Sequence, residues 1–226
     1  PCSSCGDVDF PMDYELLVEV VTPTPTPTPI PTAVPITYNV TDDFQTETTG
    51  YDPAQWIVAQ SSSSSAPNRV TWDGSDEVRL TNDNSDPVSL MSQSKLKGAN
   101  LSIRLNANGS INGYSEIGWS NCSDCPYRGK ENDYEIMFRI KQNGDLLGVM
   151  RMPGSSSSTT CASNFASGWH DLNLYWDGAG IVTVSEDGQL LCTNVSSHPN
   201  TPELSFMARV TGVAELDLDF VRVEET

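Results

Sequence analysis

The sequence is poor in positive charge. Its 226 residues include 12 Lys and Arg against 30 Asp and Glu, a formal net charge of −18. A chain this acidic repels nucleic acid and anionic lipid, so neither is expected as a partner. Long hydrophobic runs are also missing, because no stretch approaches the roughly 20 apolar residues of a membrane helix. The sequence therefore predicts no membrane insertion.

Histidine and helical patterning are scarce as well. The two histidines, His170 and His198, give no basis for a Ser-His-Asp arrangement. No segment combines a helical hydrophobic period with capping residues, so helix is expected to be nearly absent. Hydrophobic residues still make up 37% of the chain, which is enough to form the core of one domain.

Cysteines and glycosylation sequons indicate an oxidising compartment. The cysteines are even in number: Cys2, Cys5, Cys122, Cys125, Cys161 and Cys192. Asn-x-Ser/Thr sequons, the acceptors of N-linked glycans, occur at Asn39, Asn100, Asn108, Asn121 and Asn194. Together with a Thr-Pro repeat that offers hydroxyls for O-linked sugar, they predict a secreted glycoprotein, extracellular or at the cell surface.

Two interpretations of the cysteines remain open. Cys2 and Cys5, like Cys122 and Cys125, are spaced as CxxC pairs, which form either disulfides or together a four-cysteine zinc site. We favour disulfides, because thiolates oxidise outside the cell. Cys161 and Cys192 flank residues 168–191 and form the best long-range pair, although sequence alone does not fix the connectivity.

The chain divides into three parts. Residues 1–21 form an N-terminal arm that holds the first cysteine pair and a strand-like run with Tyr14, Leu16, Val18 and Val20 on one side. Residues 22–35 are a Pro-Thr linker, expected to adopt polyproline II and to span roughly 43 Å. Residues 36–226 are expected to form the folded domain.

The composition of residues 36–226 is that of an all-β domain. Turn dipeptides recur along it: Asp73-Gly74, Asn108-Gly109, Asn112-Gly113, Asn143-Gly144, Asp177-Gly178 and Asp187-Gly188. Strands are expected at 135–141, 146–152, 171–176, 181–185 and 203–209, and loops at the Ser-rich stretches 61–65 and 155–158. The predicted fold class is an all-β, two-sheet antiparallel jelly-roll sandwich that follows an extended N-terminal arm.

One segment resembles a known family. Residues 168–191 read GWHDLNLYWDGAGIVTVSEDGQLL, with the pattern Trp-His, Trp-Asp-Gly and Asp-Gly. This pattern is similar to a hairpin of laminin G-like and pentraxin-like domains, members of the concanavalin A-like lectin/glucanase group. Residues 41–44, 52–56 and 216–224 resemble the first and last strands of that group. The fold hosts lectins, glycosidases, adhesion modules and structural proteins, so the resemblance implies fold more than function.

The clearest enzymatic candidate is Glu215-Leu-Asp217-Leu-Asp219, which resembles the Glu-x-Asp-x-Glu strand of laminarinase-type glucanases. Alternate acids on one strand would project carboxylates into a groove, as retaining glycosidases require. The third acid is Asp rather than Glu, and the motif lies at the end of the chain. We therefore expect an edge strand with Leu216, Leu218 and Phe220 packed inward, and no enzymatic activity.

Ligand sites are indicated only weakly. Asp42, Asp43, Asp217 and Asp219 are calcium candidates because the first and last strands of this fold often lie side by side; no other cofactor is expected. Aromatic candidates for stacking on sugars are Trp72, Tyr114, Trp119 and Tyr127.

The N-terminal arm suggests a function. An isolated apolar strand is unstable in water, so residues 13–21 must join a sheet. We therefore expect a structural subunit that binds copies of itself, a homopolymer in which each arm completes a neighbour's sheet by donor-strand complementation and so builds an extracellular filament. The alternatives are an arm that folds back on its own domain and a secreted carbohydrate-binding or adhesion module on a Pro-Thr stalk, with glycans as partners.

Overall fold

The computed structural model describes most of one domain. The described residues are 40–44, 54–60, 69–72, 77–82, 87–109, 113–122, 133–141, 143–162, 165, 168–195 and 202–226, and all belong to the unit Ile36–Thr226. The arm and the linker, with the strand residues Tyr14, Leu16, Val18 and Val20, lie outside them. None of the described segments is a helix long and apolar enough to cross a membrane.

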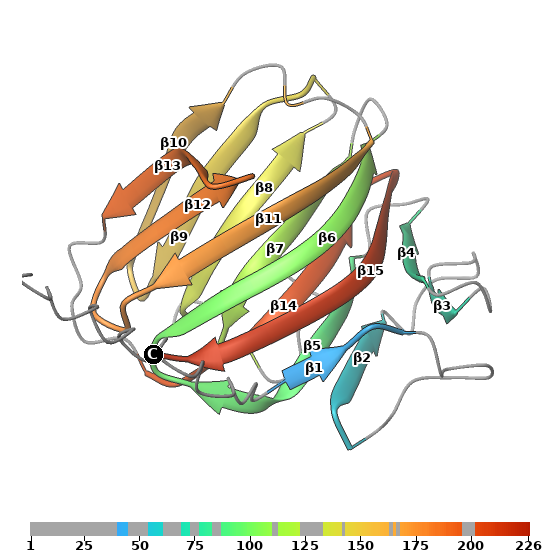
Figure 1. Cartoon of the computed structure of the whole chain (residues 1–226), viewed down its shortest axis with the longest axis horizontal. Helices are drawn as coiled ribbons and strands as arrows, with labels where there is room; N and C mark the ends of the chain where they lie inside the picture. Colours follow the sequence, from blue (N-terminus) through green and yellow to red (C-terminus); the bar gives the residue numbers. More distant parts are fainter. Residues whose placement is uncertain are drawn as a thin grey trace, which may run out of the picture. The chain divides into compact units, whose positions relative to one another are not determined.

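The described residues form two antiparallel sheets, shown in Figure 1. Sheet A has the order β13-β12-β11-β6-β15-β4-β3, and β1 also pairs with β15. Its strands are β1 Val40–Asp42, β3 Arg69–Trp72, β4 Val78–Asn82, β6 Ala99–Gly109, β11 Trp169–Trp176, β12 Ile181–Glu186, β13 Gln189–Val195 and β15 Ala214–Glu225. Sheet B has the order β10-β9-β8-β7-β14-β5-β2. Its strands are β2 Trp56–Gln60, β5 Val88–Leu96, β7 Tyr114–Ser120, β8 Glu135–Lys141, β9 Leu146–Met152, β10 Ser155–Ala162 and β14 Leu204–Thr211.

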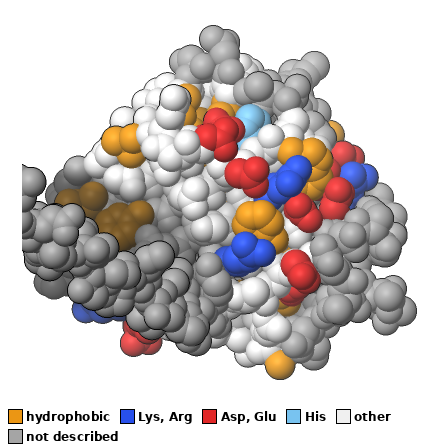
Figure 2. Space-filling model, viewed as in Figure 1, with side chains coloured by type: hydrophobic (Ala, Val, Ile, Leu, Met, Phe, Trp, Pro, Cys, Tyr) orange, Lys and Arg blue, Asp and Glu red, His pale blue; other side chains and the backbone are white. Residues whose placement is uncertain are grey.

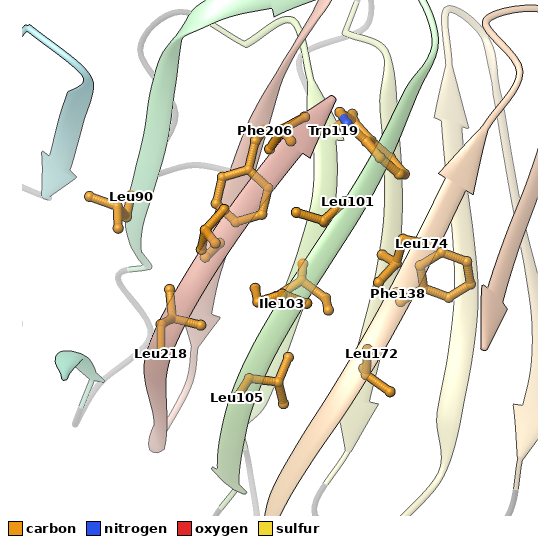
Figure 3. Close-up of a cluster of buried hydrophobic side chains, with 14 of the residues drawn as sticks. Leu90, Leu101, Ile103, Leu105, Trp119, Phe138, Leu172, Leu174, Phe206 and Leu218 are labelled. Carbon is orange, nitrogen blue, oxygen red and sulfur yellow. The ribbon is translucent and has the colours of Figure 1, made fainter. Parts of the chain in front are cut away.

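The hydrophobic core fills the space between the sheets. Figure 3 shows leucine, isoleucine and aromatic side chains of both sheets pointing toward one another. Strand β11 illustrates the pattern, because Leu172, Leu174 and Trp176 are buried while the residues between them are exposed. Trp176 packs on Trp119 of the opposite sheet, with ring centroids 5.8 Å apart. The predicted all-β, two-sheet jelly-roll sandwich is confirmed.

Most of the strands expected from alternation are present. Strands β8 and β9 have the expected bounds, and β11, β12 and β14 differ from the expected ranges by a few residues. The expected tight turn at Asp187-Gly188 joins β12 to β13, with φ of +49° and +77°. These positive angles explain the Asp-Gly dipeptide, because few other residues adopt them without strain.

Four local expectations were wrong. Residues 155–158 form a strand rather than a loop, because β10 pairs with β9 along its length. Asn108 and Gly109 lie within β6 instead of making a turn. Strand β15 is not an edge strand, since it pairs with both β6 and β4. A register shift between Leu218 and Phe220 also turns Phe220 away from the core.

The connection between β11 and β12 depends on one carboxylate. Asp177 Oδ1 accepts hydrogen bonds from the backbone N–H groups of Ala179, Gly180 and Ile181, at 2.8, 2.7 and 2.9 Å. Partial burial alone would raise the pKa of Asp177, but these donors outweigh it and lower the pKa. The Trp-Asp-Gly motif therefore shapes this turn, which sets the register of two strands at the site described next.

Candidate functional site

The outer face of sheet A carries polar residues in register across four strands. Tyr175 of β11 lies opposite Thr183 of β12 and Asn100 of β6, and Asn100 lies opposite Glu224 of β15. The alternation of side chains along each strand brings all four residues to the same face. They form one row across the sheet.

A second row runs beside the first. Asn173 of β11 lies opposite Ser185 of β12 and Ser102 of β6. Ser102 Oγ donates to Asn173 Oδ1 at 2.8 Å, and Ser185 Oγ donates to the Asn173 carbonyl at 3.5 Å. These hydrogen bonds hold the side chains of Ser102 and Asn173 together on the sheet surface.

The two rows line a shallow pocket of about 390 Å³. Its lining residues are Asn100, Leu101, Ser102, Asn173, Leu174, Tyr175, Thr183, Ser185 and Glu224. Figure 2 shows this side of the molecule, where a broad white area of backbone and uncharged polar side chains lies beside a group of charged and apolar side chains. Amide and hydroxyl groups both donate and accept hydrogen bonds, and Tyr175 adds an aromatic surface that is 39% exposed. Among the described lining residues, Glu224 is the only charged one.

The other end of the same face is aromatic and charged. Trp169 is 38% exposed, and the Arg104 guanidinium lies 5.6 Å from its ring centroid. Arg222 lies 4.7 Å from the ring of Phe220. Trp169 and Tyr175 both face outward on β11, roughly 20 Å apart at about 3.3 Å per residue. An extended ligand on this face would therefore contact aromatic rings at both ends.

The outer face of sheet B holds a buried ion network. Glu116 of β7 accepts hydrogen bonds from Arg139 of β8 and Arg209 of β14, and Glu135 of β8 accepts them from Arg209 and from Arg151 of β9. Burial alone would raise the pKa of Glu116, but Arg209, Arg139 and Arg151 outweigh it and hold this pKa below its usual value. Burial likewise opposes the charge of Arg209, and the two carboxylates reverse this and raise its pKa. Glu116 is therefore kept ionised.

The acids of the Glu215-Leu-Asp217-Leu-Asp219 motif, the enzymatic candidate that the sequence analysis set aside, are not aligned on β15. Asp217 is buried and accepts hydrogen bonds from Arg79 Nε at 2.5 Å and Asn106 Nδ2 at 3.3 Å. Asp219 lies at the register shift and pairs with Arg104 at 3.5 Å, while Glu215 is exposed. The shift interrupts the alternation that would have aligned the three carboxylates.

The calcium candidates are likewise not brought together. Asp42 Oδ2 accepts a hydrogen bond from Trp56 Nε1 at 2.6 Å, and Asp42 Oδ1 accepts one from the Phe44 backbone at 2.8 Å. Strand β1 does pair with β15, but Asp42 lies opposite Val221. Within the described ranges, no three carboxylates, histidines or cysteines are grouped as metal ligands. Asp43, Asp217 and Asp219 are thus not assembled with Asp42.

The disulfide predicted between Cys161 and Cys192 is present. It joins β10 to β13, which are end strands of sheet B and sheet A respectively. Cys122 is also disulfide-bonded. Cys2, Cys5 and Cys125 lie outside the described residues.

The predicted sugar-stacking aromatics do not form the pocket. Trp119 is buried in the core, and Tyr114 is half-buried below the Arg139 guanidinium, 4.1 Å from its ring centroid. The Trp72 side chain and Tyr127 lie outside the described part of the chain. Tyr175 was missed, although the alternation of Leu172, Leu174 and Trp176 would have placed it outward.

The sequons differ in accessibility. Asn100 is exposed and lies in the pocket lining, whereas the Asn194 side chain is 7% exposed. Asn121 Oδ1 accepts a hydrogen bond from the Tyr134 backbone at 2.8 Å. Asn39 and the side chain of Asn108 lie outside the part of the chain that the structure describes. Occupancy of these sites stays a prediction.

Comparisons with known proteins establish the fold. No family model and no curated protein matches the sequence. A β-glucanase from Bacillus licheniformis has a similar structure, with a TM-score of 0.64, 15% identity, and coverage of 83% of this chain and 98% of that one. A glycosyl hydrolase family protein from Mycobacterium fortuitum is also similar, with a TM-score of 0.61, 14% identity, and coverage of 83% of this chain and 100% of that one. The carbohydrate recognition domain of Emp46p has a TM-score of 0.57 and 8% identity, and the match covers 76% of this chain and 88% of that one. The fold is therefore the concanavalin A-like jelly roll, as the resemblance implied.

These comparisons correct two expectations. The filament function with donor-strand assembly was wrong, because the structural neighbours are glycan-active proteins and none indicates self-assembly. The expectation of no enzymatic activity was also wrong, since glycoside hydrolases stand among the most similar structures. The N-terminal arm, on which the filament argument rested, lies outside the described residues.

Proposed function

We propose that this chain is a secreted glycan-binding domain that holds neutral oligosaccharide on the outer face of sheet A. The pocket lined by Asn100, Ser102, Asn173, Tyr175 and Ser185 carries the proposal. Sugars present hydroxyl groups, which need both donors and acceptors, and apolar C–H faces, which pack on aromatic rings. This lining supplies both, and its single carboxylate, Glu224, favours a neutral ligand over an anionic one.

Fold and chemistry support the proposal together. The fold is shared with the carbohydrate recognition domain of Emp46p and with a β-glucanase, both of which handle glycans. The Cys161–Cys192 disulfide fits an oxidising, extracellular setting in which such ligands are found.

Binding of β-glucan oligosaccharides, measured by titration calorimetry, tests the proposal. Tyr175→Ala should weaken binding at least tenfold, or about 1.4 kcal/mol, because it removes the aromatic surface. Asn173→Ala should also weaken binding. Leu190→Ala is the matched control, since Leu190 is 65% exposed and is not among the pocket residues. Equal affinity in all variants, or no saturable binding to any neutral glycan, would overturn the assignment.

Glycoside hydrolysis is a second candidate, favoured by a carboxylate pair on sheet B. The Oε2 atoms of Glu116 and Glu135 lie 2.5 and 3.2 Å from the same atom, Arg209 Nη2. They are therefore no more than roughly 6 Å apart, near the separation of about 5–5.5 Å in retaining glycosidases. The lowered pKa of Glu116 keeps this carboxylate ionised, as a nucleophile must be.

Release of reducing ends from β-glucans measures this activity. Glu135→Gln and Glu116→Gln should each reduce it at least a hundredfold, since general acid–base catalysis contributes about 10²–10⁴. Glu203→Gln, at an exposed position next to β14, is the control. Release that is unchanged in both variants would place hydrolysis at other residues.

A further inference from the structure

The ion network on sheet B consists of direct neighbours in the sheet. Glu116 lies opposite Arg139 on one side and Arg209 on the other, and Glu135 lies opposite Arg151. Arg209 also bridges to Glu135, with Nη1 donating to Oε1 at 2.9 Å. Five charged side chains on four adjacent strands therefore share one surface.

The charges of this network do not balance. The described members are three guanidinium groups and two carboxylates, so the network carries one excess positive charge. The chain as a whole carries −18, which makes a buried cationic excess unexpected. Side chains of Glu116, Glu135 and Arg209 have no exposed surface. Among the described residues, this network has one cation more than it has anions, and its buried position makes a further negative group favourable there.

Two of the arginines remain within reach of a ligand. The Arg139 side chain is 16% exposed and the Arg151 side chain 18%. Arg139 donates Nε and Nη2 to Glu116 Oε1, at 2.9 and 2.6 Å, so its orientation is fixed. Below it lies the ring of Tyr114, 4.1 Å from the guanidinium carbon. A cation held against an aromatic ring offers a charge contact and a stacking surface at one point.

Apolar side chains on the same face strengthen electrostatic contacts there. Met91, Met137, Leu147, Val149 and Met207 form a buried cluster separate from the main core. The low dielectric of such surroundings increases the attraction between an arginine and an anion. Arginine also binds planar oxyanions through paired N–H donors, which a single ammonium group does not provide.

We propose that Arg139 and Arg151 form a site for an oxyanion carried by a sugar, either the carboxylate of a uronic acid or a sulfate ester. The site lies on the opposite sheet from the neutral pocket, so it goes beyond the proposed glycan-binding function, and it adjoins the Glu116–Glu135 pair of the second candidate function. Arg209 is a positioning residue, because it holds both carboxylates between the arginines. The bound anion supplies the counter-charge that the five described residues lack.

Titration calorimetry of the full chain with sodium glucuronate, glucose and sodium sulfate at equal ionic strength tests the site. Glucuronate or sulfate should bind saturably and glucose should bind at least tenfold more weakly at this site. Arg139→Gln and Arg151→Gln should each weaken anion binding at least tenfold. Arg104→Gln is the control, because Arg104 lies on sheet A and is 44% exposed.

Each outcome decides the proposal. Binding of glucuronate but not sulfate assigns uronic acids, and the reverse assigns sulfated sugars. If the glutamine variants do not fold, Arg151→Lys keeps the charge but not the paired donors, and it should bind anions more weakly than the wild type. Equal binding of glucose and glucuronate by the Tyr175→Ala variant, no anion binding by the wild type, or anion binding unchanged in the Arg139 and Arg151 variants would refute the site. Tyr175→Ala should weaken the binding of neutral sugar to the pocket on sheet A but leave anion binding to sheet B unchanged. This difference separates the two proposals.

Discussion

Arg209 of β14 and Glu116 of β7 form a fully buried ion pair, in which Arg209 Nε and Nη2 donate to Glu116 Oε2 at 2.9 and 2.5 Å. The two residues are 93 positions apart in the sequence, yet they are direct neighbours in sheet B. Neither side chain is exposed. This contact anchors the network on that face and leads to the first two predictions.

Replacing Arg209 should destabilise the domain strongly. Arg209→Met leaves Glu116 and Glu135 buried without their shared partner, and breaking a buried pair in this way costs about 3–5 kcal/mol. The control Arg104→Met removes a surface pair with Asp219 and should change stability by no more than about 1 kcal/mol. Urea unfolding of both variants measures the difference. Similar losses in the two would contradict a special role for the buried pair.

Stability should fall in acid partly through Glu116. Its folded pKa lies below the ordinary value of 4.5, so the folded state binds fewer protons than the unfolded chain. The stabilisation is therefore complete above about pH 4.5 and is lost as the pH falls through the lower, folded pKa. Melting temperatures from about pH 7 to about pH 3 should decrease more steeply for the wild type than for Glu116→Gln. Glu203→Gln should follow the wild type, and parallel curves for the wild type and Glu116→Gln would count against this assignment.

The Cys161–Cys192 disulfide should stabilise the sandwich by joining an end strand of each sheet. The bond closes a loop with a sequence separation of 31. Its removal in a Cys161→Ser, Cys192→Ser variant should cost about 2–4 kcal/mol. Chemical denaturation measures the loss, and adding a reductant to this variant then reports on the separate disulfide of Cys122. A variant as stable as the wild type would show that the edges hold without the bond.

Asp177 should be required for the turn between β11 and β12. Asp177→Ala removes an acceptor of three backbone N–H groups and should cost about 1–2 kcal/mol. Asp177→Asn keeps an acceptor oxygen and should cost less. Hydrogen exchange of the Ala179, Gly180 and Ile181 amides, measured beside overall stability, should accelerate only in the alanine variant. Equal protection in the two variants would mean that the turn forms without the side chain.

Much of the local structure was predictable because it depends on short patterns. The alternation of Leu172, Leu174 and Trp176 defines the buried side of β11, and Asp187-Gly188 encodes a turn with positive φ. The same alternation places Tyr175 outward. Patterns of this kind failed at Ser155–Ser158, because the polarity of those residues favours a loop whereas pairing with β9 makes them a strand.

The candidate sites were not predictable, because they depend on which strands become neighbours. The motif Glu215-Leu-Asp217-Leu-Asp219 has the right spacing for paired acids, but a register shift at Asp219 and the ion pair of Asp217 with Arg79 give the three carboxylates different surroundings. No sequence motif marks Glu116 or Glu135. The two carboxylates become a pair because both accept hydrogen bonds from Arg209 in the folded sheet.

The sequence by itself therefore determined the acidic composition, the all-β class, the tight turn at Asp187-Gly188 and the buried side of strands such as β11, because these follow from residue type and from a period of two. Only the tertiary structure decided the order of the strands. That order places β7 between β8 and β14 and β11 between β6 and β12. It thereby creates both the ion network and the polar pocket, since pairing between distant strands is set by the packing of the whole core rather than by any local pattern.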